Sequence, residues 1–395
     1  MENLLQKYAA KLVRAGLTEA GGALLGLRGA ETLWSREDKA CAALETVMAA
    51  IDKQAILFAE PAEPYRTIIE YLAETSSGVI EPRDFETRTF LHDLPVLPEL
   101  DPQAVAAVLK RRRSVIIAGR GVITFGKTGP KAAFVIYSSV CFACFVKFFS
   151  DTLYHVRRNS VDHRRKEILN KVMERLDPPP ATTGTLMPGP FAAEEQILPA
   201  MAEAGRLLVD CRLVDSNFGN ISYFADPVLY ISPKGGALDE LQGRIVPVSL
   251  ADHSAPTQTA STEFPAHRDI VLATGQRAVL HGHPKFAVIL SLDCDKDDCE
   301  GRDTCHIRCP HERSIGGVPI VAGEAGGGPF GLCHTVPPAM RDHPGVIVYG
   351  HGLFTAGKHD FNEAFARLAA IENACRQEYF RRIKQMGDWH SDLTS

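Results

Sequence analysis

The sequence has no uninterrupted apolar run long enough to span a membrane, no secretory signal and no large excess of charge of one sign. Its most apolar stretch, residues 132–149, is interrupted by Tyr137, Ser138, Ser139 and Lys147, so it falls short of the roughly 18 apolar residues that a membrane-spanning helix needs. The formal net charge is −5, with both signs interspersed, and we expect neither a membrane nor a nucleic-acid partner. Because the N-terminus lacks the basic and then apolar order of a signal peptide, a cytoplasmic location is expected.

The composition is that of a globular protein. Hydrophobic residues make up 45% and charged residues 23% of the 395 residues, which excludes a disordered or collagen-like chain. A chain of this length is expected to form two domains, each with its own core. The ten cysteines are expected to be thiols or metal ligands, since disulfides are rare in the cytosol.

A segment rich in proline and glycine divides the chain. Residues 177–190 contain three consecutive prolines and a later Pro-Gly-Pro sequence, which a regular helix or strand does not tolerate. Residues 164–176 before it and 193–208 after it have apolar side chains at helical intervals. The sequence therefore predicts an N-terminal domain over 1–176, a linker over 177–190 and a C-terminal domain over 191–395.

The two halves contain an internal repeat. Residues 115–127 (VIIAGRGVITFGK) and 346–358 (VIVYGHGLFTAGK) are identical at seven of thirteen positions, with a constant separation of 231 between matching residues. Each copy is expected to form a short buried strand, a glycine turn and a second strand that leads into a long helix. We interpret the chain as a duplicated domain. The C-terminal turn carries His351, which can ligate a metal, and the N-terminal turn carries Arg120, which cannot.

Three histidines are candidate ligands of a divalent metal. His281 and His283 follow an apolar stretch, and residues two apart on a strand point to the same face, so both imidazoles can reach one ion. His351 adds a third imidazole from a second strand end. Three histidines with an open fourth position are expected of a catalytic zinc or a similar divalent ion.

Polar residues upstream of these histidines are candidates for proton transfer and anion binding. Glu263 is expected near the start of a helix, after Ser261 and Thr262, whose hydroxyls suit capping and anion binding. The alternative is a simple helix cap beside a solvated glutamate. His267, one helical turn later, is expected to pack or to form hydrogen bonds rather than to ligate a metal. Two further turns offer glycine amides, an asparagine and a cation that suit a phosphate. The residues of these turns are Gly219, Asn220, Lys234 and Gly235.

The order of these motifs resembles the class II aldolase/adducin family. The sequences GNIS, SPKG, STE, HGH and GHG follow one another within about residues 193–386. The resemblance implies an α/β fold of two tandem α/β/α domains, each a central, mainly antiparallel sheet flanked by helices. It also implies Zn²⁺, or Mn²⁺, Co²⁺ or Fe²⁺, at His281, His283 and His351, and it gives Glu263 the role of acid/base. The phosphate-binding positions that it implies are Gly219, Asn220, Lys234, Gly235, Ser261 and Thr262.

The implied activity is that of a metal-dependent carbon–carbon lyase of the class II aldolase type. Its substrate would be a phosphorylated or otherwise anionic hydroxy-carbonyl compound, which reacts through a metal-stabilised enediolate. Lys234 departs from the small hydroxyl residue of the aldolase pattern, and no catalytic tyrosine is identified. An epimerase, a dehydratase or a decarboxylase would need the same chelate, so the sequence does not separate these reactions. A non-catalytic assembly protein like adducin is the alternative from a different class.

The N-terminal copy matches the family less well. It has no recognisable counterpart of GNIS, SPKG or the His281–His283 pair, and Arg120 replaces the third histidine. We therefore expect this copy to bind no metal and to act as a structural partner. In the family's ring-shaped tetramers a neighbouring subunit takes that place, so the resemblance implies a homodimer that forms a pseudo-tetrameric ring.

A cysteine-rich insertion over residues 293–316 has no counterpart in the family pattern. Four of the ten cysteines fall within sixteen residues of it, which packing alone does not explain. Four thiolates suit a structural zinc or an iron–sulfur cluster, and free or redox-active thiols are the third possibility; His306 or His311 could replace one sulfur. The cysteines are Cys294, Cys299, Cys305 and Cys309.

Overall fold

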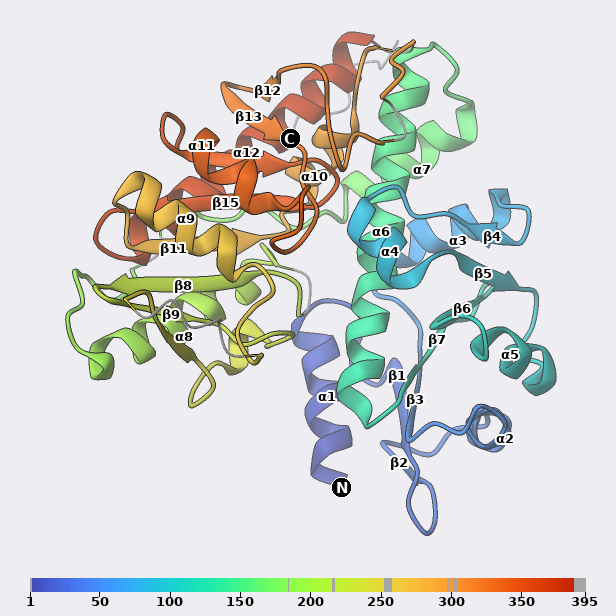
Figure 1. The fold of residues 1–395 in the computed structure, drawn as a ribbon. Coiled ribbons are helices and arrows are strands. Elements are labelled where there is room, and N and C mark those ends of the chain that lie inside the picture. The colour runs from blue at the N-terminus through green and yellow to red at the C-terminus, as the bar shows by residue number, and fades with distance from the viewer. Residues whose placement is uncertain are drawn as a thin grey trace. The chain divides into compact units, whose positions relative to one another are not determined.

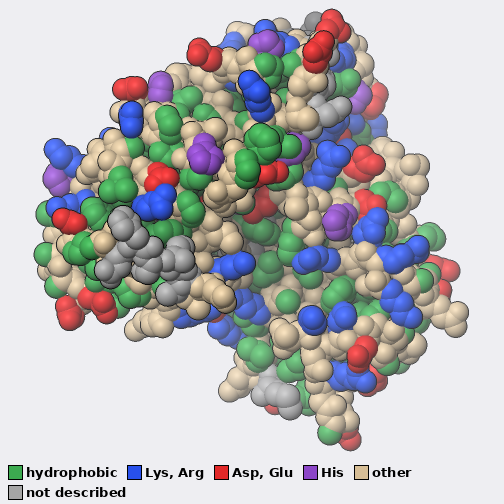
Figure 2. Space-filling model, viewed as in Figure 1, with side chains coloured by type: hydrophobic (Ala, Val, Ile, Leu, Met, Phe, Trp, Pro, Cys, Tyr) green, Lys and Arg blue, Asp and Glu red, His purple; other side chains and the backbone are tan. Residues whose placement is uncertain are grey.

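The structure, a computed structural model, describes residues 2–183, 185–214, 217–251, 258–296, 298–301 and 304–386. The chain divides into two compact units, Met1–Pro178 and Pro179–Ser395, which are called unit 1 and unit 2 below (Figure 1). Acidic and basic side chains both occur across the face drawn in Figure 2, in keeping with the interspersed charges of the sequence.

Unit 1 is built on a mixed sheet of seven strands. Its elements are α1 (Glu2–Arg14), β1 (Ala23–Leu27), β2 (Leu33–Trp34), α2 (Cys41–Ile51), β3 (Ala55–Ala59), α3 (Tyr65–Thr75), β4 (Val79–Ile80), α4 (Phe85–Leu91), β5 (Leu94–Leu97), α5 (Pro102–Leu109), β6 (Ser114–Ile117), β7 (Gly121–Gly126), α6 (Pro130–Arg157) and α7 (His163–Met173). The strand order is β2-β1-β3-β7-β6-β5-β4. Every neighbouring pair is antiparallel except β5 and β6.

Helices cover both faces of this sheet. The helices α2 and α5 pack on one face, where Leu44 and Val105 join Ile56 and Ile123 in one buried cluster. The helices α1 and α6 contact the strands from the other side, with α3 packed against α6. Strand β1 is therefore buried along its whole length, which explains its continuous apolar sequence.

The long helix α6 corrects one expectation from the sequence. Among the described residues it is the one helix that is long and apolar enough, by length and composition, to cross a membrane, with a mean hydropathy of 1.9 over its most apolar window. The expectation that no stretch reaches this limit is wrong, because the serines and the single lysine that interrupt the run lower its mean hydropathy too little. Within unit 1, 83% of this window is buried, as in the core helix of a soluble protein.

Unit 2 is built on a mixed sheet of eight strands. Its elements are α8 (Glu194–Asp210), β8 (Asn220–Ala225), β9 (Val228–Ile231), η1 (Leu238–Glu240), β10 (Val246–Ser249), α9 (Phe264–Thr274), β11 (Ala278–Gly282), α10 (Lys285–Leu292), β12 (Arg313–Ile315), β13 (Val318–Val321), η3 (Leu332–His334), α11 (Val336–Met340), β14 (Gly345–Val348), β15 (Gly352–Gly357) and α12 (Phe361–Met386). The strand order is β10-β9-β8-β11-β15-β14-β13-β12. Among these described strands, the only parallel pair is β13 with β14.

This sheet is also covered on both faces. Phe264 and Ile270 of α9 and Met340 of α11 pack with Val346 and Phe354 of the strands in one buried cluster. The helices α8, α10 and α12 contact one another and the strands of the sheet. The mainly antiparallel sheet flanked by helices that the sequence predicts for this region is therefore present.

The second half of the predicted linker is bound to unit 2. The backbone N–H groups of Leu186 and Gly189 donate to the side chains of Asn362 and Asp360, each at 2.9 Å. Buried backbone donors need partners, and side chains supply them here because the prolines prevent a regular ladder. The first half of the segment is bound there as well, because Nδ2 of Asn373 donates to the carbonyl oxygen of Pro180 at 2.9 Å.

Candidate metal centre

Two neighbouring strands carry the three histidines that the sequence singles out. His281 lies in β11, His283 follows the end of that strand, and His351 occupies the turn between β14 and β15. The strands β11 and β15 are paired, with His281 opposite Phe354, and the two rings are stacked with their centroids 4.0 Å apart. This pairing brings the turn that carries His351 beside the end of β11.

Glycines allow the two strand ends to approach each other closely. A Cβ atom at Gly352 would lie 2.4 Å from the carbonyl oxygen of Gly282 and 2.7 Å from Cε1 of His281, so no side chain fits there. Gly350 has a φ of 57°, a left-handed conformation that glycine adopts without strain. The glycines of the HGH and GHG motifs are therefore required by the geometry of the histidine site.

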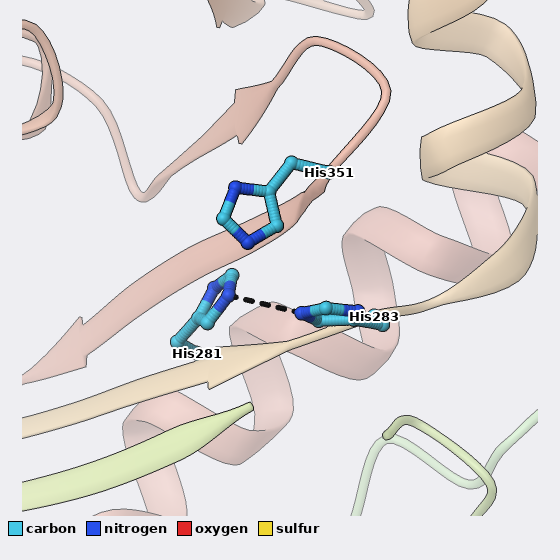
Figure 3. A group of neighbouring side chains, drawn as sticks. All are labelled: His281, His283 and His351. Carbon is cyan, nitrogen blue, oxygen red and sulfur yellow. Dashed lines mark hydrogen bonds between the residues drawn. The ribbon is translucent and has the colours of Figure 1, made fainter. Parts of the chain in front are cut away.

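The three imidazoles converge in the interior of unit 2 (Figure 3). One ring nitrogen from each of His281, His283 and His351 lies within 4.8 Å of the others, and all three residues are buried. The Nε2 atoms of His281 and His283 are 3.1 Å apart. Among the residues that the structure describes, this is the only group of three or more potential ligands that meets this limit.

The hydrogen bonding of His281 fits a metal ligand. Its Nδ1 lies 3.2 Å from the carbonyl oxygen of Leu353, and a carbonyl can only accept, so Nδ1 carries the proton. The lone pair of Nε2 then faces the other two histidines. Burial and the neighbouring imidazoles hold the pKa of His281 well below its usual value, so the ring is neutral. A neutral imidazole that is fixed by a carbonyl through its other nitrogen is the usual form of a histidine that binds a metal.

Glu263 lies against the histidines. It is the residue before α9, and its two carboxylate oxygens lie 3.4 Å from Nε2 of His351 and 3.5 Å from Nε2 of His281. Burial raises the pKa of the Glu263 carboxyl, while the hydrogen bond from Asn220 and the nearby His283 lower it. A buried carboxyl group whose pKa is raised in this way is a candidate for proton transfer.

A chain of hydrogen bonds fixes the carboxylate of Glu263. Nδ2 of Asn220 donates to Glu263 at 2.7 Å, so Oδ1 of Asn220 faces Nε2 of His267, which must donate to it. Nδ1 of His267 then accepts from the Ser222 hydroxyl at 2.7 Å. Burial lowers the pKa of His267 to about 3, so the ring is neutral and has one donor and one acceptor, as the chain requires. His267 is therefore a hydrogen-bonding residue rather than a ligand, as expected from the sequence.

We expect His267→Leu to reduce both stability and turnover. The substitution leaves buried polar atoms of Asn220 and Ser222 unpaired, which costs about 1–3 kcal/mol, and it frees the Asn220 amide that orients Glu263. Urea unfolding measures the first effect, and the rate at saturating metal and substrate measures the second. Ser222→Ala is the control, because it removes only the outermost partner. If both variants turn over at the wild-type rate, the chain does not position Glu263.

Hydrogen bonds join the turn after β9 to the two other segments that are predicted to hold a phosphate. The N–H of Lys234 donates to the carbonyl oxygen of Thr259 at 2.8 Å, which joins the turn after β9 to the segment before α9. Asn217 lies just before β8, and its Nδ2 donates to the carbonyl oxygen of Gly235 at 2.9 Å. Gly219 and Gly235 both have positive φ, at 97° and 61°. The structure therefore brings three separate polar segments together at one end of β8 and β9.

The remaining predicted phosphate residues have different surroundings. Thr262 is exposed. Ser261 is buried, and its hydroxyl accepts a hydrogen bond from the N–H of Glu263 at 3.3 Å. Asn220 uses its side-chain oxygen for His267 and one of its N–H groups for Glu263. Of the six predicted positions, Asn220 is thus the one with the least capacity left for a ligand.

Glu372 binds the start of α10, the helix that follows His283, and carries no recognisable sequence signal. It lies in the middle of α12, and its carboxylate accepts hydrogen bonds from the N–H groups of Phe286 and Ala287, each at 2.9 Å. The first N–H groups of a helix have no partner within the helix, and these two belong to the start of α10, three and four residues after His283. Burial raises the pKa of Glu372 to about 7. A glutamate in an amphipathic helix is usually solvated, so sequence reasoning misses it.

The four cysteines of the insertion do not converge as closely as the histidines. All four are described and free of disulfides, but they do not form a second group of ligand atoms within 4.8 Å of one another. The insertion is shorter than predicted at its C-terminal end, because β12 begins at Arg313 and pairs with β13. The cysteine segment is therefore the connection between α10 and β12.

Comparison with known proteins relates unit 2 to one family. Residues 199–379 match the family model described as Class II Aldolase and Adducin N-terminal domain. No curated protein matches the chain. Three solved structures match about half of it. L-fuculose-1-phosphate aldolase of Thermus thermophilus is 24% identical, with 49% of this chain and 98% of that chain covered and a TM-score of 0.41. Sugar-phosphate aldolase of Thermotoga maritima is 17% identical (50% of this chain and 99% of that chain covered, TM-score 0.36), and L-fuculose 1-phosphate aldolase of Glaciozyma antarctica is 16% identical (53% and 90% covered, TM-score 0.35).

Proposed function

We propose that unit 2, in which residues 199–379 match the model of the class II aldolase and adducin family, is a divalent-metal-dependent lyase. Its substrate would be a phosphorylated or otherwise anionic hydroxy-carbonyl compound. The observation that carries the proposal is the buried convergence of His281, His283 and His351 with Glu263 within 3.4–3.5 Å of two of the rings. A scaffold protein would have no need to bury these groups against one another, because doing so disfavours their charged forms.

The roles of the side chains follow from their contacts. The three histidines would hold the ion, preferably Zn²⁺, which would supply Lewis-acid stabilisation of negative charge on the substrate oxygens. Glu263 would accept a proton from the substrate and return it to the product. Asn220 and His267 hold its carboxylate in one orientation, and the raised pKa that burial gives it suits both halves of this transfer.

The anionic group of the substrate would bind at the three joined turns. Lys234 supplies a positive charge, and Gly219 and Gly235 allow backbone N–H groups to face a ligand. Ser261 and Thr262 complete the set. We assign Asn220 chiefly to the orientation of Glu263, because its side chain already has two buried partners.

An assay for carbon–carbon cleavage tests the proposal. The metal-loaded protein is incubated with a panel of ketose 1-phosphates, and the release of an aldehyde and a three-carbon ketone phosphate is followed by NMR. Cleavage that disappears when the metal is removed is the expected result. A changed substrate without carbon–carbon cleavage would favour the epimerase, dehydratase or decarboxylase alternative. No reaction together with no bound metal would favour an adducin-like assembly protein.

We also propose that unit 1 is a second, degenerate copy of the same domain. The order β2-β1-β3-β7-β6-β5-β4 corresponds to β9-β8-β11-β15-β14-β13-β12, and the one parallel pair falls at the same place in both sheets. The pairs Ser114↔Thr124 and Gly345↔Thr355 lie at the separation of 231 that relates the repeated sequences. The buried threonine hydroxyl donates to the helix that follows in each unit, at 2.8 Å.

The same correspondence supports a loss of the metal site in unit 1. The α2–β3 block matches the α9–β11 block, and both helices end in a left-handed residue, Asp52 and Gly275. The expectation that the His-x-His motif has no counterpart is thereby refined, because Phe58 and Glu60 occupy the equivalent positions. The positions of His281, His283, His351 and Glu263 correspond in unit 1 to Phe58, Glu60, Arg120 and Ala40.

Two copies in each chain support a homodimer with four domains of this type, as the resemblance implies. Light scattering at micromolar concentration is expected to give a mass near twice the 43.1 kDa of one chain. The measurement is repeated at a tenfold lower concentration to exclude weak association. A mass of one chain at both concentrations would rule out the dimer.

A further inference from the structure

The segment between α10 and β12 lacks the side chains that usually hold a loop in place. Residues 293–312 contain four cysteines and many charged residues, and Ile307 is the only aliphatic side chain among them. A segment of this composition buries too little apolar surface to offset the entropy of ordering it. Segments of this kind are commonly held by disulfides or by a structural metal.

The segment nevertheless contains one buried thiol. Cys305 is only 6% exposed, and its Sγ donates to the carbonyl oxygen of Gly301 at 3.3 Å. A Cβ atom at Gly301 would lie 3.8 Å from the Sγ atom of Cys299, so two of the four sulfurs lie beside the same glycine. Burial raises the pKa of the Cys305 thiol, and Cys309, Cys294 and Cys299 add to the rise. Cys299 and Cys305 are therefore close to each other through Gly301, and Cys294 and Cys309 belong to the same connection between α10 and β12.

These four cysteines, of which Cys305 is buried and the others are half-buried, differ from the buried cysteines of the helices. Cys141 and Cys144 lie in α6 and Cys375 lies in α12, where they pack among apolar helix residues. The residues next to the segment cysteines in the sequence are mostly charged or polar, so they do not offer such an apolar environment. Unit 1 has only residues 76–78 between α3 and β4, at the place that corresponds to this segment, so the sheet does not need the insertion in order to form.

We propose that Cys294, Cys299, Cys305 and Cys309 form a second metal site, which takes one tetrahedral zinc-type ion. Each sulfur would give up its proton on binding, and Zn–S distances of about 2.3 Å would draw the four sulfurs closer together than they lie without the ion. A site closed by four protein ligands has no open position for a substrate. The ion would therefore be structural, in contrast to the one at the histidines.

The second ion would also support the first. The side chain of Tyr349, two residues before His351, contacts the Cys305 thiol and the guanidinium of Arg313, which lies over its ring at 5.6 Å. Arg313 donates to the carbonyl oxygen of Ser291 at 2.8 Å, and the Ser291 hydroxyl accepts from the N–H of Gly350 at 2.9 Å. The cysteine segment thus lies behind the turn that presents His351.

Cobalt titration of the reduced, metal-stripped full-length protein tests the proposal without any substitution. Cobalt bound by four thiolates has an intense sulfur-to-metal charge-transfer band in the near ultraviolet, and cobalt bound by imidazoles does not. We expect the wild-type protein to develop this band as one ion binds per chain. Added zinc should abolish it, because zinc competes for the same thiolates.

Four variants assign the band to its residues. Cys305→Ser and Cys309→Ser should lose it, whereas Cys211→Ser, which removes a half-buried thiol outside the segment, should keep it. His351→Ala should keep the band while the histidine site loses its ion, so a failure of this proposal is distinguishable from a failure of the proposed lyase site. Circular dichroism checks that each variant is folded.

Two results would overturn the proposal. One is a wild-type protein that shows no charge-transfer band while its four segment cysteines react freely with a thiol reagent. The other is a disulfide among them, detected by mass spectrometry of the non-reduced protein, that survives incubation with zinc and reductant.

Discussion

Glu263→Gln is expected to lower turnover by about 10²–10⁴-fold, the range that a positioned general acid or base contributes, while the protein keeps its metal. Glutamine has nearly the same shape as glutamate, and its side-chain oxygen can still accept the hydrogen bond that Asn220 donates at 2.7 Å. What the variant loses is the ability to take up and return a proton. Steady-state rates and elemental analysis of the same preparations measure the two quantities.

The control for this variant is Glu195→Gln. Glu195 is an exposed glutamate in the first turn of α8, far along the chain from the histidines, and its substitution should change neither rate nor metal content. If Glu263→Gln instead lost the metal and retained its activity per bound ion, Glu263 would be a ligand only, and the assignment of proton transfer to it would be wrong.

His351→Ala is expected to weaken metal binding by roughly 100-fold or more, beyond the 10–100-fold that loss of an outer partner costs. The substitution removes one of three imidazoles. Only two imidazole ligands then remain for the ion, those of His281 and His283, whose Nε2 atoms are 3.1 Å apart. Turnover should fall with the metal content. Metal titration with a competing chelator measures the affinity, and addition of excess zinc tests whether activity returns in part.

His359→Ala is the matched control for the loss of an imidazole. Its side chain is exposed in the loop after β15, so the variant should bind metal as the wild-type protein does. Equal metal affinity in both variants would show that the ion is held elsewhere. Loss of helical circular dichroism in His351→Ala would show that the buried imidazole also supports the fold, and His351→Gln would then replace it as the test.

The metal ligands could be predicted from the sequence because their signals are local. Residues two apart on a strand share a face, which identifies His281 and His283 as a pair. The repeat adds His351, since the glycines around it are preserved in both copies. Gly352 explains that preservation, because a Cβ atom there would collide with Gly282.

Contacts between distant segments could not be predicted in this way. His267 joins Asn220 only because α9 packs against the strand that carries Asn220, 47 positions away. Glu372 reaches the start of α10 from 86 and 85 positions away. In the sequence both residues have the pattern of ordinary helix residues. Their hydrogen bonds beside the site arise only from the packing of distant segments.

The degenerate copy that we propose in unit 1 illustrates a different limit. In that proposal strand β3 corresponds to β11, because each pairs with equivalent neighbours, but Phe58 takes the place of His281. A motif search depends on those residues and therefore overlooks the strand. Sheet topology and strand register depend on which residues are buried and on the backbone hydrogen bonds between strands, and both sequences have the apolar pattern that these require.

The exchange of substrate hydrogen with solvent tests the central claim most directly. Dihydroxyacetone phosphate, the simplest phosphorylated hydroxy-ketone, is incubated in D₂O with metal-loaded protein, and the proton signal of the hydroxymethyl group beside the carbonyl is followed by NMR. We predict that the wild-type protein replaces this hydrogen with deuterium, and that the metal-stripped protein and Glu263→Gln do not. Exchange that is absent with metal-loaded wild-type protein, or equally fast after the metal is removed, would contradict a metal-dependent lyase with Glu263 as its base.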